Sequence, residues 1–204
     1  MNRNLYYVFT AISFALLVAA PGRFAFGIII CLELFFLIFT GFLFSYLLKK
    51  LLLHEMNSIV TVLGLIFSTV LYKQIIMAVY PLIALQMSFV FYLPAVSSYM
   101  IGIIYKNIDA STKISVIDNL KITSYFSIFA LVFYAIRDIF GYGTFTLPSP
   151  NGIFEKQLLS SDNMLWGTFF ASIPGALVLV CIVIFIFIHA QKKIKIVRRA
   201  EESK

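Results

Sequence analysis

The hydrophobic positions of this chain form long continuous runs and do not alternate with polar positions. About 20 apolar residues in a helix cross the hydrocarbon core of a bilayer, whereas a transmembrane strand alternates polar and apolar positions. The pattern therefore predicts transmembrane helices. The six runs are Leu5–Ala20, Phe24–Leu48, Ile59–Tyr80, Leu82–Tyr105, Ile122–Phe140 and Leu165–Ile188.

The predicted fold class is all-α integral membrane, with six transmembrane helices arranged as two inverted three-helix repeats. An odd number of spans in each half forces the halves to have opposite orientations in the bilayer, a plan shared by many transporters. We expect a single six-helix domain over 1–204, with repeat 1 at about 1–80, repeat 2 at about 81–191, and a basic cytoplasmic tail at 192–204.

Composition supports this class. The chain has 204 residues, of which 61% are hydrophobic and only 12% are charged, and its mean hydropathy is +0.97. Such values are typical of membrane proteins and leave no room for a soluble module. The first run resembles a signal peptide, since Arg3 precedes it and Val18-Ala19-Ala20 resembles a cleavage site. Five further spans follow at once, so we interpret it as a retained first helix.

The distribution of Lys and Arg predicts the orientation, because cytoplasmic loops are enriched in both. With six spans, both termini share one side of the membrane, and we expect that side to be the cytoplasm. Twelve of the 16 basic residues lie there: Arg3, Lys49, Lys50, Lys106, Lys113, Lys121, Lys192, Lys193, Lys195, Arg198, Arg199 and Lys204. The net charge of +7 follows from this bias. It implies contact with anionic lipid headgroups and no nucleic acid partner.

Two linkers are polar enough to be loops. Lys106–Lys121 is mixed in charge and is predicted to be cytoplasmic. Gly141–Asn163 is predicted to be external, and it contains two prolines followed by a small amphipathic piece around Ile153–Leu159.

Glu33 is the first candidate for a functional residue, because it lies well inside the second apolar run. Burying a lone carboxylate costs several kcal/mol unless it is paired, protonated or bound to a cation. Glu33 is therefore either a proton or cation contact on an ion path, or a protonated or interfacial residue that stabilises helix packing.

Arg137 and Asp138 place opposite charges at the end of the fifth apolar run, just before Gly141 and Gly143. Adjacent helical residues diverge by about 100°, so each should seek its own partner. We interpret the pair mainly as a helix-end anchor whose long basic side chain reaches the interface, with the two glycines ending the helix. Lys73 is interpreted in the same way.

Two prolines interrupt apolar runs. Pro94 precedes Ser97-Ser98 in the fourth run, and a broken helix there is typical of a substrate or cofactor position, although a simple kink is the alternative. Pro174-Gly175-Ala176 in the sixth run predicts a second kink and a close-packing surface.

No catalytic residue or metal site is predicted. Cys31 and Cys181 lie in different apolar runs without the spacing of an iron–sulfur site, so we interpret them as buried apolar residues. His54 and His189 fall at predicted helix ends and form no ligand cluster, and no catalytic triad or phosphate-binding loop is present.

Three segments together resemble a known family. Arg137-Asp138-Ile-Phe-Gly141-Tyr-Gly143-Thr144-Phe145 is similar to an Arg-Glu-x-x-Gly-x-Gly-Thr-Leu segment, and Ile173-Pro174-Gly175-Ala176 to a Pro-Pro-Gly-Ala-Phe helix start. Val116-Ile-Asp118-Asn-Leu120 resembles a Leu-Asp-x-Leu stretch before the fifth helix. The chain thus resembles, nearly end to end, the six-helix membrane subunits of the Rnf and sodium-pumping NADH:quinone oxidoreductase complexes, of the type called E in Rnf and D in the sodium pump.

The resemblance implies pairing with a sister six-helix subunit of opposite topology, in a complex of the bacterial cytoplasmic (inner) membrane that couples electron transfer to Na⁺ or H⁺ movement. In that family, cysteines of the first and fourth helices hold a shared [2Fe-2S] cluster. Ser13 and Ser98 occupy those positions here. Neutral serine is a poor iron ligand beside thiolate. We therefore expect no cofactor in this chain, with flavins and Fe–S clusters in partner subunits.

These observations leave three hypotheses. The first is a non-autonomous subunit of a redox-driven ion translocator, without its own cluster. The second is a stand-alone transporter of ions or small molecules that uses Glu33 and the Pro94–Ser98 break as its site. The third is a structural membrane partner whose polar residues only pack.

Overall fold

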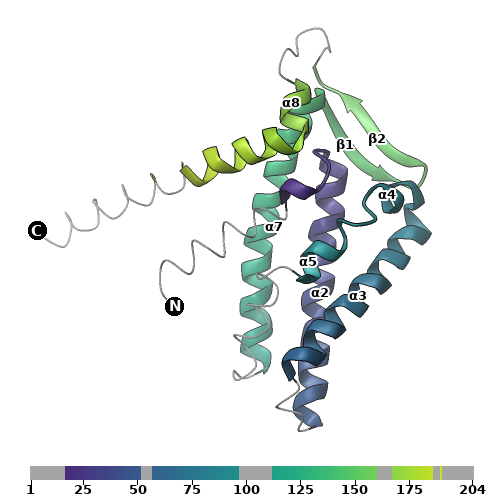
Figure 1. Cartoon of the computed structure of the whole chain (residues 1–204), viewed down its shortest axis with the longest axis vertical. Coiled ribbons are helices and arrows are strands. Elements are labelled where there is room, and N and C mark those ends of the chain that lie inside the picture. Colours follow the sequence, from purple (N-terminus) through teal and green to yellow (C-terminus); the bar gives the residue numbers. More distant parts are fainter. Residues whose placement is uncertain (1–16, 52–56, 97–111, 160–166, 186–188, 190–204) are drawn as a thin grey trace, which may run out of the picture.

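The computed structural model describes residues 17–51, 57–96, 112–159, 167–185 and 189 (Figure 1). These residues are mostly helical, with one small antiparallel sheet. The elements are α2 (Phe24–Lys50), α3 (Asn57–Val79), α4 (Pro81–Gln86), α5 (Tyr92–Val96), α7 (Thr112–Tyr142), β1 (Thr144–Ser149), β2 (Gly152–Gln157) and α8 (Gly167–Ala171). An apolar helix, Ile173–Phe185, follows α8.

Three helices are long and apolar enough to cross a membrane. The candidate spans are Phe24–Leu48 in α2, Ile59–Val79 in α3 and Asn119–Tyr142 in α7. At about 1.5 Å per residue each helix is longer than the roughly 30 Å of a hydrocarbon core. The predicted second, third and fifth helices are thus confirmed as membrane-length helices. The six-span plan stays a prediction, since most of the first apolar run lies outside the described residues.

Helix α2 lies between α7 and α3 and packs on both (Figure 1). On the α7 side, the Cys31 thiol donates a hydrogen bond to the Ser127 carbonyl oxygen over 3.6 Å. On the α3 side, the Tyr72 hydroxyl donates to the Ile29 carbonyl oxygen over 2.8 Å. The apolar core fills the space where these helices meet α5, and Phe91 of the segment before α5 is fully buried in it.

The fourth apolar run is not one continuous helix in its described part. It forms the short helices α4 and α5, joined by turns over Met87–Phe91. Pro94 gives the reason, because a helical proline has no N–H to donate and clashes with the carbonyl four residues earlier. The helix therefore restarts at Tyr92, with Pro94 in its first turn. The break lies upstream of the predicted position at Pro94–Ser98.

The sixth apolar run is also interrupted. Its described part ends one helix at Ala171, bends at Ser172 and begins another helix at Ile173. Pro174 falls in the first turn of that second helix, where its missing N–H leaves no internal bond unmade. A bend near Pro174 was expected, and the structure places it at Ser172.

The predicted external loop is largely a β-hairpin, which corrects the expectation of an amphipathic piece around Ile153–Leu159. Strands β1 and β2 pair from Thr144↔Gln157 to Ser149↔Gly152, so Pro150 and Asn151 form the turn. The hairpin leans from the end of α7 towards α4 (Figure 1). The predicted cytoplasmic linker is also shorter than expected, because α7 begins at Thr112 and not at Ile122.

Candidate functional site

Arg137 is completely buried near the end of α7 and binds backbone carbonyls from two other segments. Its Nη1 donates to the Leu17 and Ala20 carbonyl oxygens over 3.2 and 3.0 Å, and its Nη2 donates to the Ala171 carbonyl oxygen over 3.0 Å. Leu17–Ala19 is helical and Ala171 ends α8. A cation close to the last carbonyls of a helix satisfies groups that have no partner within the helix.

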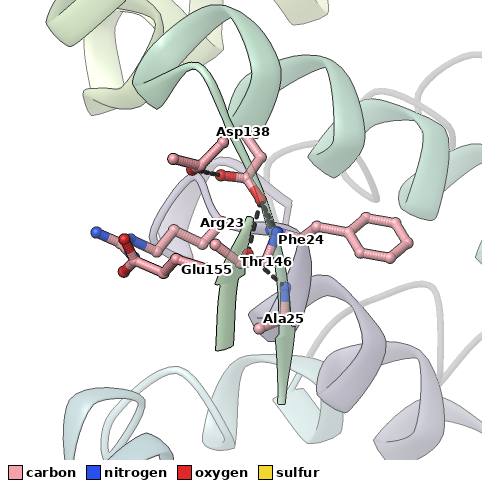
Figure 2. A network of polar contacts seen from close by, with 7 residues as sticks. Arg23, Phe24, Ala25, Asp138, Thr146 and Glu155 are labelled. Atoms are coloured by element: carbon pink, nitrogen blue, oxygen red, sulfur yellow. Dashed lines mark hydrogen bonds and ion pairs between the residues drawn. The ribbon is translucent and has the colours of Figure 1, made fainter. Parts of the chain in front are cut away.

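Asp138, the next residue, is equally buried but binds donors (Figure 2). Its Oδ2 accepts hydrogen bonds from the Phe24 N–H (3.1 Å), the Thr146 N–H (2.8 Å) and the Thr146 hydroxyl (2.6 Å). Its Oδ1 accepts one from the Thr144 hydroxyl over 3.0 Å. Because Phe24 begins α2, Asp138 supplies an acceptor and a negative charge at a helix N-terminus.

The Arg137 and Asp138 contacts form one junction between the end of α7, α8, the start of α2 and β1. Gly141 and Gly143 give this junction its backbone geometry. Gly143 has a φ of 66°, the left-handed conformation that ends helices. A Cβ at Gly141 would lie 2.9 Å from the Ala171 Cβ and 3.0 Å from the Ala171 backbone nitrogen. Gly141 therefore permits α8 to approach α7 closely. The expectation that the glycines end the helix is confirmed for Gly143, which follows the last residue of α7, whereas Gly141 lies within α7.

Arg137 and Asp138 turn into the protein, which corrects the expectation that the basic side chain reaches the headgroup region. Each has its own partners, as their divergence on a helix predicted. A second layer lies outside them, where Arg23 forms an ion pair with Glu155 of β2. The Arg23 guanidinium also lies over the Tyr142 ring, 4.7 Å from its centroid. These residues tie the hairpin to the ends of α2 and α7.

Glu33 has very different surroundings. Its side chain is 0% exposed, and among the described residues neither carboxylate oxygen has a hydrogen-bond partner. It lies within the candidate span of α2. The prediction of a buried polar point inside the membrane helices is confirmed, while its role on an ion path stays a prediction.

The remaining predicted residues have separate positions. Gly175 packs so tightly on the Phe169 carbonyl that a Cβ there would collide with it, and Pro174 is exposed. The Lys73 ammonium lies over the Tyr92 ring, 5.5 Å from its centroid. Ser13 and Ser98 lie outside the described residues.

The two thiols lie on different helices and differ in exposure. Cys31 is buried between α2 and α7, and Cys181 is exposed on the apolar helix Ile173–Phe185. Cys31 matches the expectation of a buried apolar residue, whereas Cys181 does not. Among the described residues, no group of three or more His, Cys, Asp or Glu side chains converges.

Sequence reasoning missed two contributors. Thr146 also accepts a hydrogen bond from the Ala25 N–H over 3.2 Å, so it bridges Asp138 and the start of α2. Glu155 pairs with Arg23. Both follow from the hairpin, and the only signal for it was the Pro150-Asn151-Gly152 turn between residues that alternate weakly.

No protein-family model matches the chain, and no curated protein matches it. The resemblance described above therefore rests on the residues of this chain.

Proposed function

We propose that this chain is a membrane subunit of a redox-driven ion-translocating electron transport complex of the Rnf and sodium-pumping NADH:quinone oxidoreductase type. In this role it contributes to coupling electron transfer to Na⁺ or H⁺ movement without holding an Fe–S cluster of its own. It is a non-autonomous component of a translocase and oxidoreductase, so its activity depends on partner subunits that carry flavins and Fe–S clusters.

One observation supports this proposal above the others. The residues that carry the strongest resemblance form a single connected junction. Arg137 binds the carbonyls of Leu17, Ala20 and Ala171, and Asp138 binds the start of α2 and the start of β1. A short chance similarity has no reason to coincide with a buried, interlocking unit. The coincidence supports a motif under structural constraint and, with it, the family.

The proposed setting is the bacterial cytoplasmic membrane, with both termini in the cytoplasm and six spans in two inverted repeats. The three membrane-length helices support this setting, as do their outer faces. Large apolar side chains on α3 and α7, such as Phe67 and Ile128, are more than half exposed. Such faces require lipid or a neighbouring membrane subunit, and the proposed sister subunit is one occupant.

Isolation of the intact complex tests the proposal. We expect an affinity-tagged chain, expressed from its own locus and extracted in mild detergent, to co-purify with a second six-helix membrane protein and flavin-bearing subunits. An untagged strain processed in parallel identifies background proteins. Recovery of the chain as a stable monomer under the same conditions would contradict the proposal.

A second candidate function is a stand-alone transporter. It is favoured by Glu33, a buried carboxyl without a described partner in a membrane helix. Ion or solute uptake by liposomes that contain only this chain separates the two candidates. The proposed subunit is inactive in that assay, whereas a stand-alone transporter is active and loses uptake on Glu33→Gln.

A further inference from the structure

Two buried carboxylates lie in the described membrane helices, and their surroundings are opposite. Asp138 is enclosed by donors, since two backbone N–H groups and two hydroxyls all point at its oxygens. Glu33 is equally buried, but among the described residues no donor binds either of its oxygens. A carboxylate charge without partners in a low-dielectric interior costs several kcal/mol. The Glu33 carboxylate must therefore be neutralised, either by a proton or by a bound cation.

The helical repeat shows which face of α2 carries Glu33. Residues four and seven apart share a helix face, so Glu33 lies between Ile29 and Phe36. Both neighbours contact Tyr72 of α3. The Tyr72 hydroxyl binds the Ile29 carbonyl over 2.8 Å, and the Phe36 and Tyr72 ring centroids are 5.5 Å apart. Glu33 therefore faces α3 beside Tyr72, on the side of α2 that is opposite to α7.

The face of α3 towards Glu33 carries a row of buried hydroxyls. Thr61, Ser68, Thr69 and Tyr72 are each at most 5% exposed and recur at helical spacing. Ser68 and Thr69 donate to the carbonyl oxygens of Gly64 and Leu65, which leaves their hydroxyl oxygens as acceptors. Ser68, Thr69 and Tyr72 lie within two helical turns, and Thr61 lies about 10 Å further along α3 beyond the buried Leu65.

No described cation neutralises Glu33. Tyr72 of α3 interacts electrostatically with both Glu33 and Cys31. The closest basic residue along α3 is Lys73, whose ammonium lies over the Tyr92 ring. Among the described residues the only ion pair joins Arg23 to Glu155, where α2 begins. In the described part of the chain, no group of three or more His, Cys, Asp or Glu side chains includes Glu33.

We infer that Glu33 is a proton-binding site in the membrane interior, which exchanges its proton along the hydroxyl row of α3. In the loaded state the proton is bound to the Glu33 carboxyl, which is then neutral. On release the O–H bond breaks, the proton leaves through the row and the carboxylate keeps the electron pair. This inference deepens the proposed function, because it makes the proton the ion that this subunit handles.

Carbodiimide labelling tests the loaded state, because this reagent attacks protonated carboxyl groups within membranes. The full chain in native membranes is treated with dicyclohexylcarbodiimide and analysed by peptide mass spectrometry. We expect an adduct on Glu33, none on Asp138 in the same sample, and loss of the Glu33 adduct in Glu33→Gln. A folded chain without the Glu33 adduct overturns the inference. Protection of Glu33 by Na⁺ also overturns it, in favour of a sodium site.

Hydrogen–deuterium exchange tests release. The infrared carbonyl band of the Glu33 acid, assigned by its loss in Glu33→Gln, is followed after transfer to D₂O. We expect the band to shift in the unaltered chain and to shift several-fold more slowly in Thr69→Val and Tyr72→Phe. Thr123→Val is the matched control, because Thr123 is a buried hydroxyl on α7, and it leaves the rate unchanged. A band that never shifts overturns the inference and makes Glu33 a static packing residue.

These results are independent of the complex. If Glu33 is labelled and exchanges its proton but the chain purifies alone, the result supports the proton site and contradicts the proposed subunit role. If the chain purifies with its redox partners but Glu33 forms no adduct, the result supports the subunit role and contradicts the proton site.

Discussion

At the scale of single residues, the junction at the end of α7 pairs each charge with helix ends of the opposite polarity. The Arg137 guanidinium binds carbonyls at the ends of the Leu17–Ala19 turn and of α8, whereas the Asp138 carboxylate binds the N–H that begins α2. Helix C-termini attract cations and helix N-termini attract anions. Arg137 and Asp138 therefore connect the Leu17–Ala20 segment, α8 and the start of α2 to the end of α7.

Replacement of Asp138 by Ala leaves the backbone N–H groups of Phe24 and Thr146 without an acceptor. A buried polar group that loses its partner costs about 1–3 kcal/mol. We expect Asp138→Ala to lower the free energy of unfolding by at least about 2 kcal/mol, and Asp138→Asn to cause a smaller loss because one acceptor oxygen remains. Denaturant unfolding of the purified chain in detergent measures both values.

Glu155→Gln is the matched control, because it removes a carboxylate from the same end of the molecule. Its ion pair with Arg23 is partly exposed, and such pairs contribute about 0–1 kcal/mol. Equal losses for Asp138→Ala and Glu155→Gln would show that Asp138 does not organise the junction.

The sequence identified the buried charges but not their partners. Arg137, Asp138 and Glu33 stand out because charged residues are rare in apolar runs. Their partners are distant in sequence or are backbone atoms, as with the Ala20 carbonyl and the Phe24 N–H, and backbone atoms leave no mark in a sequence. The snorkelling interpretation of Arg137 failed because the folded chain supplied carbonyls closer than the headgroups.

At the scale of elements, three prolines mark where helices begin. Pro81 is the first residue of α4, Pro94 lies in the first turn of α5, and Pro174 lies in the first turn of the helix Ile173–Phe185. A proline is tolerated there because the first N–H groups of a helix have no internal partner. Apolar runs predicted the helices of α2, α3 and α7, which contain no proline. Runs four and six were each predicted as one span interrupted at a proline, and hydropathy does not record the residue at which the helix restarts.

The contact between α7 and α8 depends on Gly141. A methyl group there would lie within about 3 Å of Ala171 backbone and side-chain atoms, which cannot move without shifting α8. Overpacking of this kind costs about 1–3 kcal/mol, more than the gain of up to about 1 kcal/mol when Ala replaces Gly within a helix. We expect Gly141→Ala to lower the free energy of unfolding by about 1–2 kcal/mol, measured by the same denaturant titration.

Val132→Ala serves as the control on the same helix, since Val132 is more than half exposed and faces away from the core. Its expected effect is within about 0.5 kcal/mol. A Gly141→Ala chain as stable as the Val132→Ala chain would mean that α8 moves aside at no cost.

At the scale of the whole molecule, one end of the helix bundle differs from the other. The hairpin, α4, α8 and the Arg137–Asp138 junction gather where α2 begins and α7 ends (Figure 1). Lys50 lies at the other end of α2, about 40 Å away at 1.5 Å per residue. The excess of Lys and Arg on the Lys50 side supports the proposal that this end faces the cytoplasm and the hairpin faces outwards.

Single-cysteine labelling tests this orientation in a chain whose native Cys31 and Cys181 are both replaced by Ala. Asn151→Cys places a thiol at the exposed hairpin turn, and Lys50→Cys places one at the exposed end of α2. We expect a membrane-impermeant maleimide to label Asn151→Cys in intact cells and Lys50→Cys only after permeabilisation. The reversed pattern would invert the proposed topology. Labelling of both thiols in intact cells would mean that α2 does not cross the membrane. Glu33 would then not lie in the membrane interior, and the proton site would be contradicted.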